Sequence, residues 1–203
     1  MKSIRLIILT ALSLLTMQSF AQTPIDALRQ MLSTDAVAIE LEYDLTVPNA
    51  MVTGSSSIWL QGEMYRVHGE GLDIFNNGKS VWTVDESTRE VIIESAADVS
   101  EDYRGNPVLL LSKMDQFFKV ESQKPIKSHT QYVLQAIADC GITKARLIIA
   151  SDGSLVSAHF SLEDGNEFSV KVQSMKKTEE SPVSFFSPQV KFGSDWIVTD
   201  LRQ

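Results

Sequence analysis

Residues 36–48, AVAIELEYDLTVP, alternate between apolar and polar side chains with a period of two residues. A strand places successive side chains on opposite faces, so this period is typical of a strand that is buried on one side only. The stretch predicts one long strand whose buried face must be covered by other parts of the chain. Its apolar face would consist of Val37, Ile39, Leu41, Tyr43, Leu45 and Val47, and its solvated face of Glu40, Glu42, Asp44 and Thr46.

Turn signals indicate that the other strands are antiparallel neighbours. Asn77-Gly78, Asp152-Gly153 and Asp164-Gly165 each lie between extended runs and tolerate the positive φ of tight hairpins. We therefore expect a meandering antiparallel sheet, with no internal repeat or domain linker. The extended runs that support it are the hairpin at 75–94 and the segments 145–150, 154–162 and 166–174.

Two segments carry helical patterns instead. Residues 24–33, PIDALRQMLS, follow Thr23, which can cap a helix, and place Ile25, Leu28, Met31 and Leu32 on one face. Residues 106–119, NPVLLLSKMDQFFK, begin with Asn106-Pro107 and predict a second helix, whose apolar sector is wider than one packing face needs. This second helix is either buried between two layers or a lid whose inner side contacts a ligand.

The first 21 residues have the features of an export signal. Lys2 and Arg5 precede an apolar run at 6–15, and Ser19-Phe20-Ala21 offers small residues where a signal peptidase cleaves. We expect cleavage after Ala21, so that residues 22–203 form a single domain in the periplasm without a membrane-spanning helix. Cys140 is the only cysteine, which excludes an internal disulfide, so a hydrophobic core must stabilise the domain.

Loss of Lys2 and Arg5 with the signal changes the formal charge from −8 to −10. A chain this acidic is a poor partner for nucleic acid and for anionic membrane surfaces, because Lys and Arg supply most of the attraction to both. A partner that is attracted by charge would have to be basic.

Several segments, in this order, resemble the periplasmic outer-membrane lipoprotein carriers, the LolA-like family. They are GSSSIWLQGEMYRV at 54–67, LDIFNNGKSVWTVDESTREVIIE at 72–94, GNPVLLL at 105–111, IASDGSLVSAHFSLEDGNEFSVKV at 149–172 and PVSFFSP at 182–188. The resemblance implies an α+β fold in which a curved antiparallel sheet forms an incomplete β-barrel and helices cover its concave face. One departure is that the stretch from Trp59 to Tyr65 lacks the strand arginine and the proline of well-studied members. Arg66 lies nearby without matching that position, so the resemblance does not say how a lid would open.

The resemblance also implies a hydrophobic cavity that binds the acyl chains of lipoproteins. By strand parity we expect one face of the sheet to line it, together with the second helix; the same residues could instead form a filled core. The expected ligand-binding residues are Tyr65, Val67, Leu72, Ile74, Trp82, Val84, Val91, Ile93, Leu110, Met114 and Phe118.

The function implied is that of a monomeric carrier that takes lipoproteins from the inner to the outer membrane, with an inner-membrane releasing transporter and an outer-membrane acceptor as partners. The alternative is a binding module of the same fold for another apolar ligand in cell-envelope biogenesis. We expect no enzyme, metal or cofactor, because His68, His129 and His159 are scattered and no serine stands in a nucleophile motif. Cys140 is interpreted as a packing residue.

Overall fold

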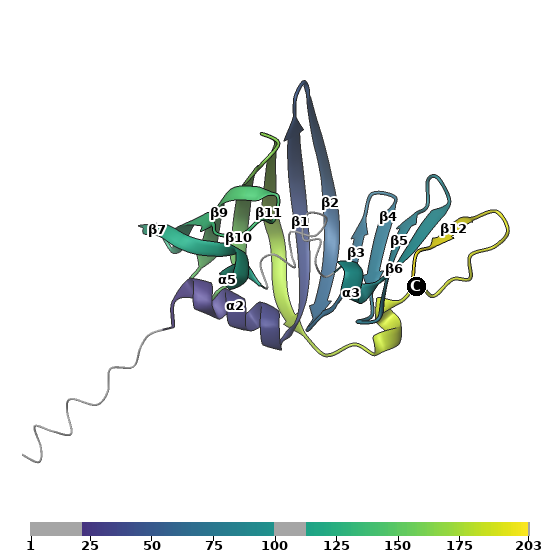
Figure 1. Cartoon of the computed structure of the whole chain (residues 1–203). Helices are drawn as coiled ribbons and strands as arrows, with labels where there is room; N and C mark the ends of the chain where they lie inside the picture. The colour runs from purple at the N-terminus through teal and green to yellow at the C-terminus, as the bar shows by residue number, and fades with distance from the viewer. Residues whose placement is uncertain (1–21, 100–112, 203) are drawn as a thin grey trace, which may run out of the picture.

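The computed structural model describes residues 22–99 and 113–202, which form a single large sheet with short helices against it (Figure 1). The strand order is β12-β6-β5-β4-β3-β2-β1-β11-β10-β9-β8-β7, and every pair is antiparallel except β12 with β6. The described elements are α2 (Pro24–Thr34), β1 (Ala36–Val47), β2 (Ala50–Gln61), β3 (Met64–Gly69), β4 (Leu72–Asn76), β5 (Ser80–Asp85), β6 (Glu90–Ser95), α3 (Ala96–Val99), α5 (Met114–Phe117), β7 (Phe118–Ile126), β8 (His129–Ala136), β9 (Ile142–Ala150), β10 (Leu155–Leu162), β11 (Glu167–Thr178), the 3-10 helix η2 (Val183–Phe186) and β12 (Ile197–Asp200).

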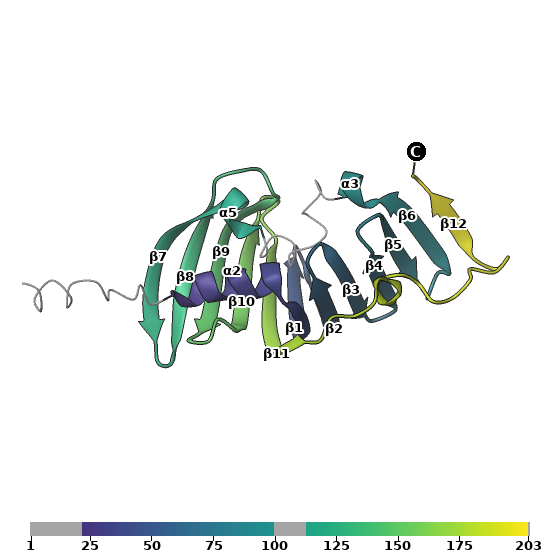
Figure 2. The ribbon, with the colours of Figure 1, turned by 90° about the horizontal axis from the view of Figure 1, so that it is seen from below.

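The sheet curves around its inner face without closing, because β12 and β7 lie at its two ends. Figure 2 shows the strands following one another along the curve, with α2 lying across the β8–β11 half. One buried cluster joins α2 and α5 to inner-face residues on both halves of the sheet. The predicted fold class, a curved antiparallel sheet forming an incomplete barrel with helices on its concave face, is confirmed.

Strand β1 lies inside the sheet between β2 and β11, and it has the one buried face that its alternating sequence predicts. Val37, Ile39 and Leu41 are buried, whereas Glu40, Glu42, Asp44 and Thr46 are exposed. The predicted turns at Asn77-Gly78, Asp152-Gly153 and Asp164-Gly165 are present, and the three glycines have φ values of 83°, 88° and 83°. Each conformation is in the left-handed region, where a side chain would be strained.

Helix α2 forms where its sequence predicts it. The Thr23 hydroxyl accepts a hydrogen bond from the backbone N–H of Asp26 at 3.3 Å, and Pro24 occupies the first turn. The four predicted apolar residues, Ile25, Leu28, Met31 and Leu32, are the buried ones. The guanidinium of Arg29 forms ion pairs with Asp26 and with Asp115, and the second pair connects α2 to α5.

The helix expected at 106–119 differs from the described structure at its C-terminal end. Residues 106–112 lie outside the described residues, and α5 contributes a single turn that ends at Phe117. Phe118 and Lys119 belong to strand β7 instead, so the expected helix extends too far. Phe118 has extended dihedral angles and pairs with Ala136 of β8, because strand pairing replaces the next helical turn there.

The outer face of β2–β6 carries a second cluster. Phe75, Val84, Val91 and Ile93 are buried there against Trp82, Phe192 and Trp196. The segment that contains η2 extends over the same face, and its Ser181 exchanges hydrogen bonds with the side chain of Gln61 at 2.7 and 3.2 Å. The C-terminal segment, including the motif at 182–188, therefore covers the face opposite α2.

Arg66 belongs to this outer face and not to the concave one. It pairs across the strands with Trp59 and Phe75, and its guanidinium carbon lies 5.0 to 5.6 Å from the ring centroids of Trp59, Phe75 and Phe185. Such cation–π contacts stabilise a partly desolvated arginine. The side chain thus holds η2 against the sheet. No helix in the described part of the chain is long and apolar enough to cross a membrane.

We predict that Gly153→Ala destabilises the domain more than Gly165→Ala. Both glycines have positive φ, but a Cβ at residue 153 would lie 2.7 to 2.9 Å from Ala27 and the backbone of α2, whereas a Cβ at residue 165 meets nothing within 4 Å. We expect Gly165→Ala to lower the free energy of unfolding by about 1 kcal/mol, and Gly153→Ala by at least about 2 kcal/mol. Urea unfolding measures both. Equal losses would show that the contact with α2 contributes nothing.

Candidate ligand cavity

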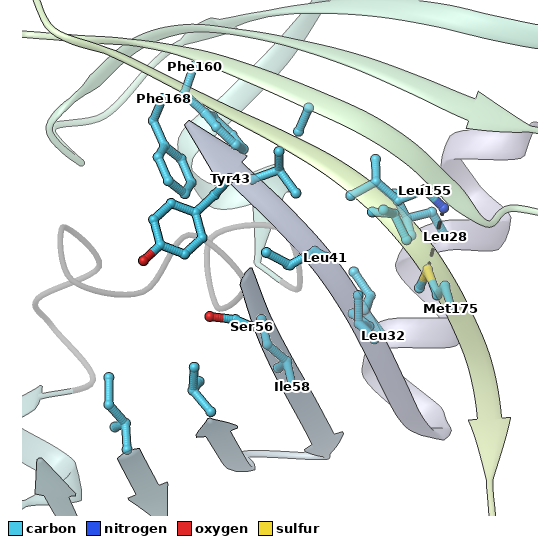
Figure 3. Close-up of a pocket in the computed structure, with 16 residues that line it drawn as sticks. Leu28, Leu32, Leu41, Tyr43, Ser56, Ile58, Leu155, Phe160, Phe168 and Met175 are labelled. Carbon is cyan, nitrogen blue, oxygen red and sulfur yellow. Dashed lines mark hydrogen bonds between the residues drawn. The ribbon is translucent and has the colours of Figure 1, made fainter. Parts of the chain in front are cut away.

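An apolar cavity lies between α2 and the inner face of the sheet (Figure 3). Its walls come from α2, from β1 to β4 on one side and from β10 and β11 on the other. The cavity therefore lies where the two halves of the sheet meet. Its lining residues are Leu28, Leu32, Ile39, Leu41, Tyr43, Ser56, Ile58, Val67, Ile74, Leu155, Ala158, Phe160, Phe168, Val170, Val172 and Met175.

Among the described residues, the lining contains no charged side chain, and its only side-chain oxygens belong to Tyr43 and Ser56. Figure 3 shows both hydroxyls at the end of the cavity away from Leu28. The cavity has a volume of about 200 Å³. An apolar cavity of about 150 Å³ already admits a molecule such as benzene, whereas sites for drug-sized ligands start at about 300 Å³. In this conformation the space suits a segment of one alkyl chain.

Tyr43 and Gly54 define one end of the cavity. They are cross-strand partners on β1 and β2, and a Cβ on Gly54 would overlap the phenol ring of Tyr43. The ring therefore lies directly over the glycine, and it lies 6.0 Å from the ring of Phe168, centroid to centroid. Because Gly54 has no side chain, the ring of Tyr43 can occupy this position and form the aromatic wall.

Two β-bulges shape the other side of the cavity. On β11 the register shifts so that Val172 opposes Leu41 while Ser174 opposes Glu40, which places Val172 and Met175 on the same face. On β10 a shift beside Val156 likewise turns both Leu155 and Ala158 inward. A bulge bends its strand and reverses the parity of the side chains beyond it. Met175 and Leu155 line the cavity because of these shifts, whereas Val172 and Ala158 keep the regular alternation of their strands. The expected set contained no residue of β10 or β11.

The structure divides the expected ligand-binding residues between the two faces of the sheet. Val67 and Ile74 are opposite each other on β3 and β4 and line the cavity. Tyr65 lies on the same inner face and is buried in the core. Leu72 also lies on this face, but it is exposed near the end of β4 and does not line the cavity.

The expectation that Trp82, Val84, Val91 and Ile93 share this face is wrong. Asn76 pairs with Val81 across the turn at Asn77-Gly78, so an even-numbered residue of β4 lies on the same side as an odd-numbered residue of β5. Trp82 therefore faces the same side as Phe75, with Ile93 beyond it on β6. The number of residues in the turn sets this register, and a change of one residue reverses the face of every side chain. These four residues belong to the outer cluster.

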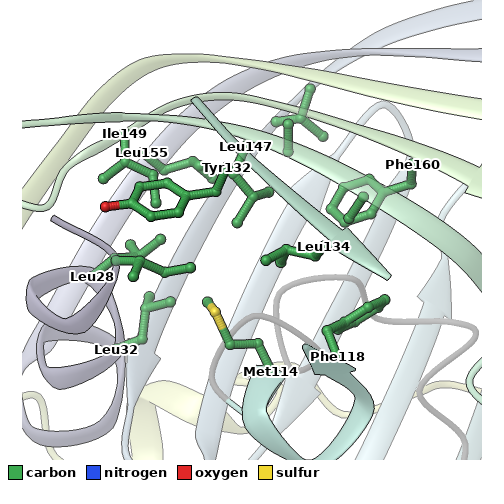
Figure 4. Close-up of a cluster of buried hydrophobic side chains, with 14 of the residues drawn as sticks. Leu28, Leu32, Met114, Phe118, Tyr132, Leu134, Leu147, Ile149, Leu155 and Phe160 are labelled. Carbon is green, nitrogen blue, oxygen red and sulfur yellow. The ribbon is translucent and has the colours of Figure 1, made fainter. Parts of the chain in front are cut away.

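The remaining expected residues come from the second helix. Leu110 lies outside the described residues. Met114 and Phe118 are 1% and 5% exposed and pack in the main core, where Figure 4 shows them among side chains of α2, β8, β9 and β10. Neither lines the cavity as it stands in this conformation.

The groups that could carry chemistry lie away from the cavity. In the described part of the chain no group of three His, Cys, Asp or Glu side chains is placed to hold a metal ion. Cys140 is buried, and its thiol donates to the carbonyl oxygen of Ile142 at 3.7 Å. Burial raises the pKa of this thiol, which disfavours the nucleophilic thiolate. His68 pairs with Asp73 at 2.6 Å, and His159 with Ser169 at 2.8 Å.

Comparisons with known proteins give structural likeness only. No protein-family model and no curated protein matches the sequence. Among solved structures, the chain is similar to a LolA superfamily protein from Nitrosomonas europaea (14% identity, TM-score 0.42, covering 83% of this chain and 97% of that one). It is also similar to a DUF1329 family protein from Desulfovibrio piger (8%, 0.46, 81% and 95%) and to the lipoprotein LppX of Mycobacterium tuberculosis (13%, 0.40, 79% and 97%). LolA-like proteins, which the sequence motifs resemble, are thus among its structural neighbours. Likeness at this level does not assign an activity.

We predict that Ala158→Leu is tolerated better than Ala145→Leu. Both alanines are buried on neighbouring strands, but only Ala158 lines the cavity, so a larger side chain there has space to enter. Ala145 lies in the packed core, where added methyl groups typically cost about 1 to 3 kcal/mol. Chemical denaturation should therefore show a near-unchanged midpoint for Ala158→Leu and a lower one for Ala145→Leu. The reverse order would contradict the position of the cavity.

Proposed function

We propose that this protein is a periplasmic carrier that binds the acyl chains of lipoproteins in the cavity between α2 and the sheet and moves them from the inner to the outer membrane. The single observation that carries the proposal is the cavity, whose lining, in the part of the chain that the structure describes, is apolar except for the hydroxyls of Tyr43 and Ser56. Such a lining fits alkyl chains and offers little to a polar substrate. The proposal is therefore of a binding protein and not of an enzyme.

Solubility gives the physical reason for such a carrier. Each buried methylene contributes about 0.8 kcal/mol, so a protein with several acyl chains scarcely leaves a bilayer unaided. A carrier must shield these chains from water and later release them. Release favours a cavity with few specific polar contacts and with an adaptable side chain such as Met175. The order of motifs that resemble the LolA-like family supports the same role.

The volume of the cavity favours a second candidate. A space of about 200 Å³ holds a segment of one chain, whereas a triacylated lipoprotein needs the walls to separate further. The second candidate is a binding module of the same fold for a single-chain apolar ligand in cell-envelope biogenesis. Mass spectrometry of lipids and lipoproteins that co-purify with the protein from periplasm separates the two candidates.

A tryptophan reporter tests binding in the cavity. Trp59, Trp82 and Trp196 all lie on the outer face, whereas Phe168 lines the cavity. We expect brominated stearate, which quenches a fluorophore only on contact, to quench the emission of Phe168→Trp strongly and that of the unmodified protein weakly. Palmitate should reverse the quenching by competition.

The unmodified protein serves as the control for the reporter, because its tryptophans are separated from the cavity by the sheet. Strong quenching in both proteins would place the ligand on the outer face. Absence of quenching in both would contradict acyl-chain binding altogether. Adding Ala158→Leu to the reporter should weaken quenching, since the added side chain occupies part of the space.

The proposed compartment has its own test. If residues 1–21 direct export, the mature protein begins at Gln22 and is released by osmotic shock with the periplasmic fraction. N-terminal sequencing of the released protein checks this. Recovery of the functional protein with Met1 intact in the cytoplasmic fraction would contradict the proposed location.

A further inference from the structure

One edge of β2 is left without a partner strand beside the cavity. Strand β2 pairs with β1 along residues 50–61, but with β3 only from Ser56 to Gln61, because β3 ends at Gly69. Among the described residues no strand pairs with the β3 side of residues 50–55. Figure 1 shows the β1–β2 hairpin extending well beyond β3. Met51 and Val52 in this stretch are 65% and 50% exposed.

The backbone of this stretch presents hydrogen-bonding groups to the open side. A Cβ on Gly69 would lie 3.6 Å from the backbone oxygen of Ser55, so the carbonyl of Ser55 points toward the β3 side. The direction of backbone groups alternates along a strand, so the N–H and C=O groups of Met51 and Thr53 point the same way. Unpaired groups of this kind form a ready template for an added strand.

The outer face next to this edge is acidic. A shallow groove of about 400 Å³ crosses β11, β1 and β2 and is lined by Glu42, Asp44, Thr53, Ser55, Glu70 and Lys171, among others. Lys171 lies 3.6 Å from Glu42 and offsets one of the three carboxylates. Only the short side chains of Thr53 and Ser55 separate the β1 carboxylates from the open edge. A strand added there would place alternate side chains over this groove, where lysine or arginine is favoured.

One end of the cavity lies beside the same edge. Ser56, the first residue of β2 that is paired with β3, lines the cavity, and Gly54 lies beneath the ring of Tyr43. A polypeptide attached to an acyl chain whose end lies beside Tyr43 and Ser56 would therefore begin next to residues 50–55. We propose that this edge binds the extended, basic peptide segment that follows the acylated end of a cargo protein, by adding it to the sheet as a strand. This inference rests on the proposed function.

Three probes test the inference. They are palmitamide, the palmitoylated peptide Lys-Thr-Lys-Val-Lys-Thr and the palmitoylated peptide Glu-Thr-Glu-Val-Glu-Thr. We expect the lysine peptide to bind about tenfold more tightly than palmitamide, because its second contact becomes intramolecular once the chain is bound, and the glutamate peptide to show no such gain. The difference in affinity between the lysine peptide and palmitamide should decrease as the salt concentration is raised.

Thr53→Pro removes one N–H from the open edge and leaves the hydrogen bonds between β2 and β1 in place. It should abolish the gain of the lysine peptide while leaving the affinity for palmitamide unchanged. Thr53→Val is the matched control, because it keeps the N–H and the β-branched shape, and it should retain the gain. Hydrogen exchange on the unmodified protein gives a readout that does not depend on either variant: the amides of Met51, Thr53 and Ser55 should gain protection when the lysine peptide binds.

The outcomes separate the two proposals. If all three probes bind equally and these amides stay unprotected, the edge inference is overturned while acyl-chain binding stands. If palmitamide does not bind, the proposed function fails. The edge is then tested by hydrogen exchange in the presence of the non-acylated lysine peptide, and the edge inference is overturned if the three amides gain no protection. Protection that grows with protein concentration in the absence of peptide would assign the edge to a second copy of the chain and overturn the proposed occupant.

Discussion

The fold depends on the burial of the inner face of β1. This strand joins the two halves of the sheet, with β2–β6 and β12 on one side and β7–β11 on the other. Only Asp35 separates it from α2, so the helix that covers the inner face is delivered by the chain segment next to the strand that needs covering. Leu28 and Leu32 on α2 and Ile39 and Leu41 on β1 face the same cavity. The same side chains of α2 and β1 therefore bury the inner face of the strand and line the cavity.

Curvature creates the space that packing leaves unfilled. Neighbouring bulges on β11 and β10 bend the sheet where α2 lies against it, and close contact of Gly153 with Ala27 holds the helix at that place. The helix contacts β9 on one side and β1 and β2 on the other, and the cavity extends from it toward Val67 on β3 and Ile74 on β4. Tyr43, resting on Gly54, forms the wall at the far end.

The sequence predicts those features that depend on local patterns. The cap at Thr23, the buried face of α2, the alternation of β1 and the glycine turns all follow from residues that lie close together in the chain. The face on which Trp82 lies cannot be predicted in this way, because it depends on how many residues the turn after Asn76 contains in the folded hairpin. The positions of the cavity residues Met175 and Leu155 likewise depend on bulges, which leave no sign in an alternating pattern. Arg66 illustrates a third case: its place under η2 follows from contacts with residues more than a hundred positions away.

Both faces of the sheet carry buried apolar clusters, and the cavity lies on the inner face, within the larger cluster. An enclosed apolar cavity costs about 24 cal/mol per Å³ in mutational series, so a space of about 200 Å³ that is partly open to solvent costs less than about 5 kcal/mol. That is comparable with the whole net stability of many domains. The outer cluster offsets part of such a cost without entering the cavity, since Phe75, Val84, Val91 and Ile93 are buried on the opposite side beneath the C-terminal segment. Filling the space with an alkyl chain would recover part of the lost free energy.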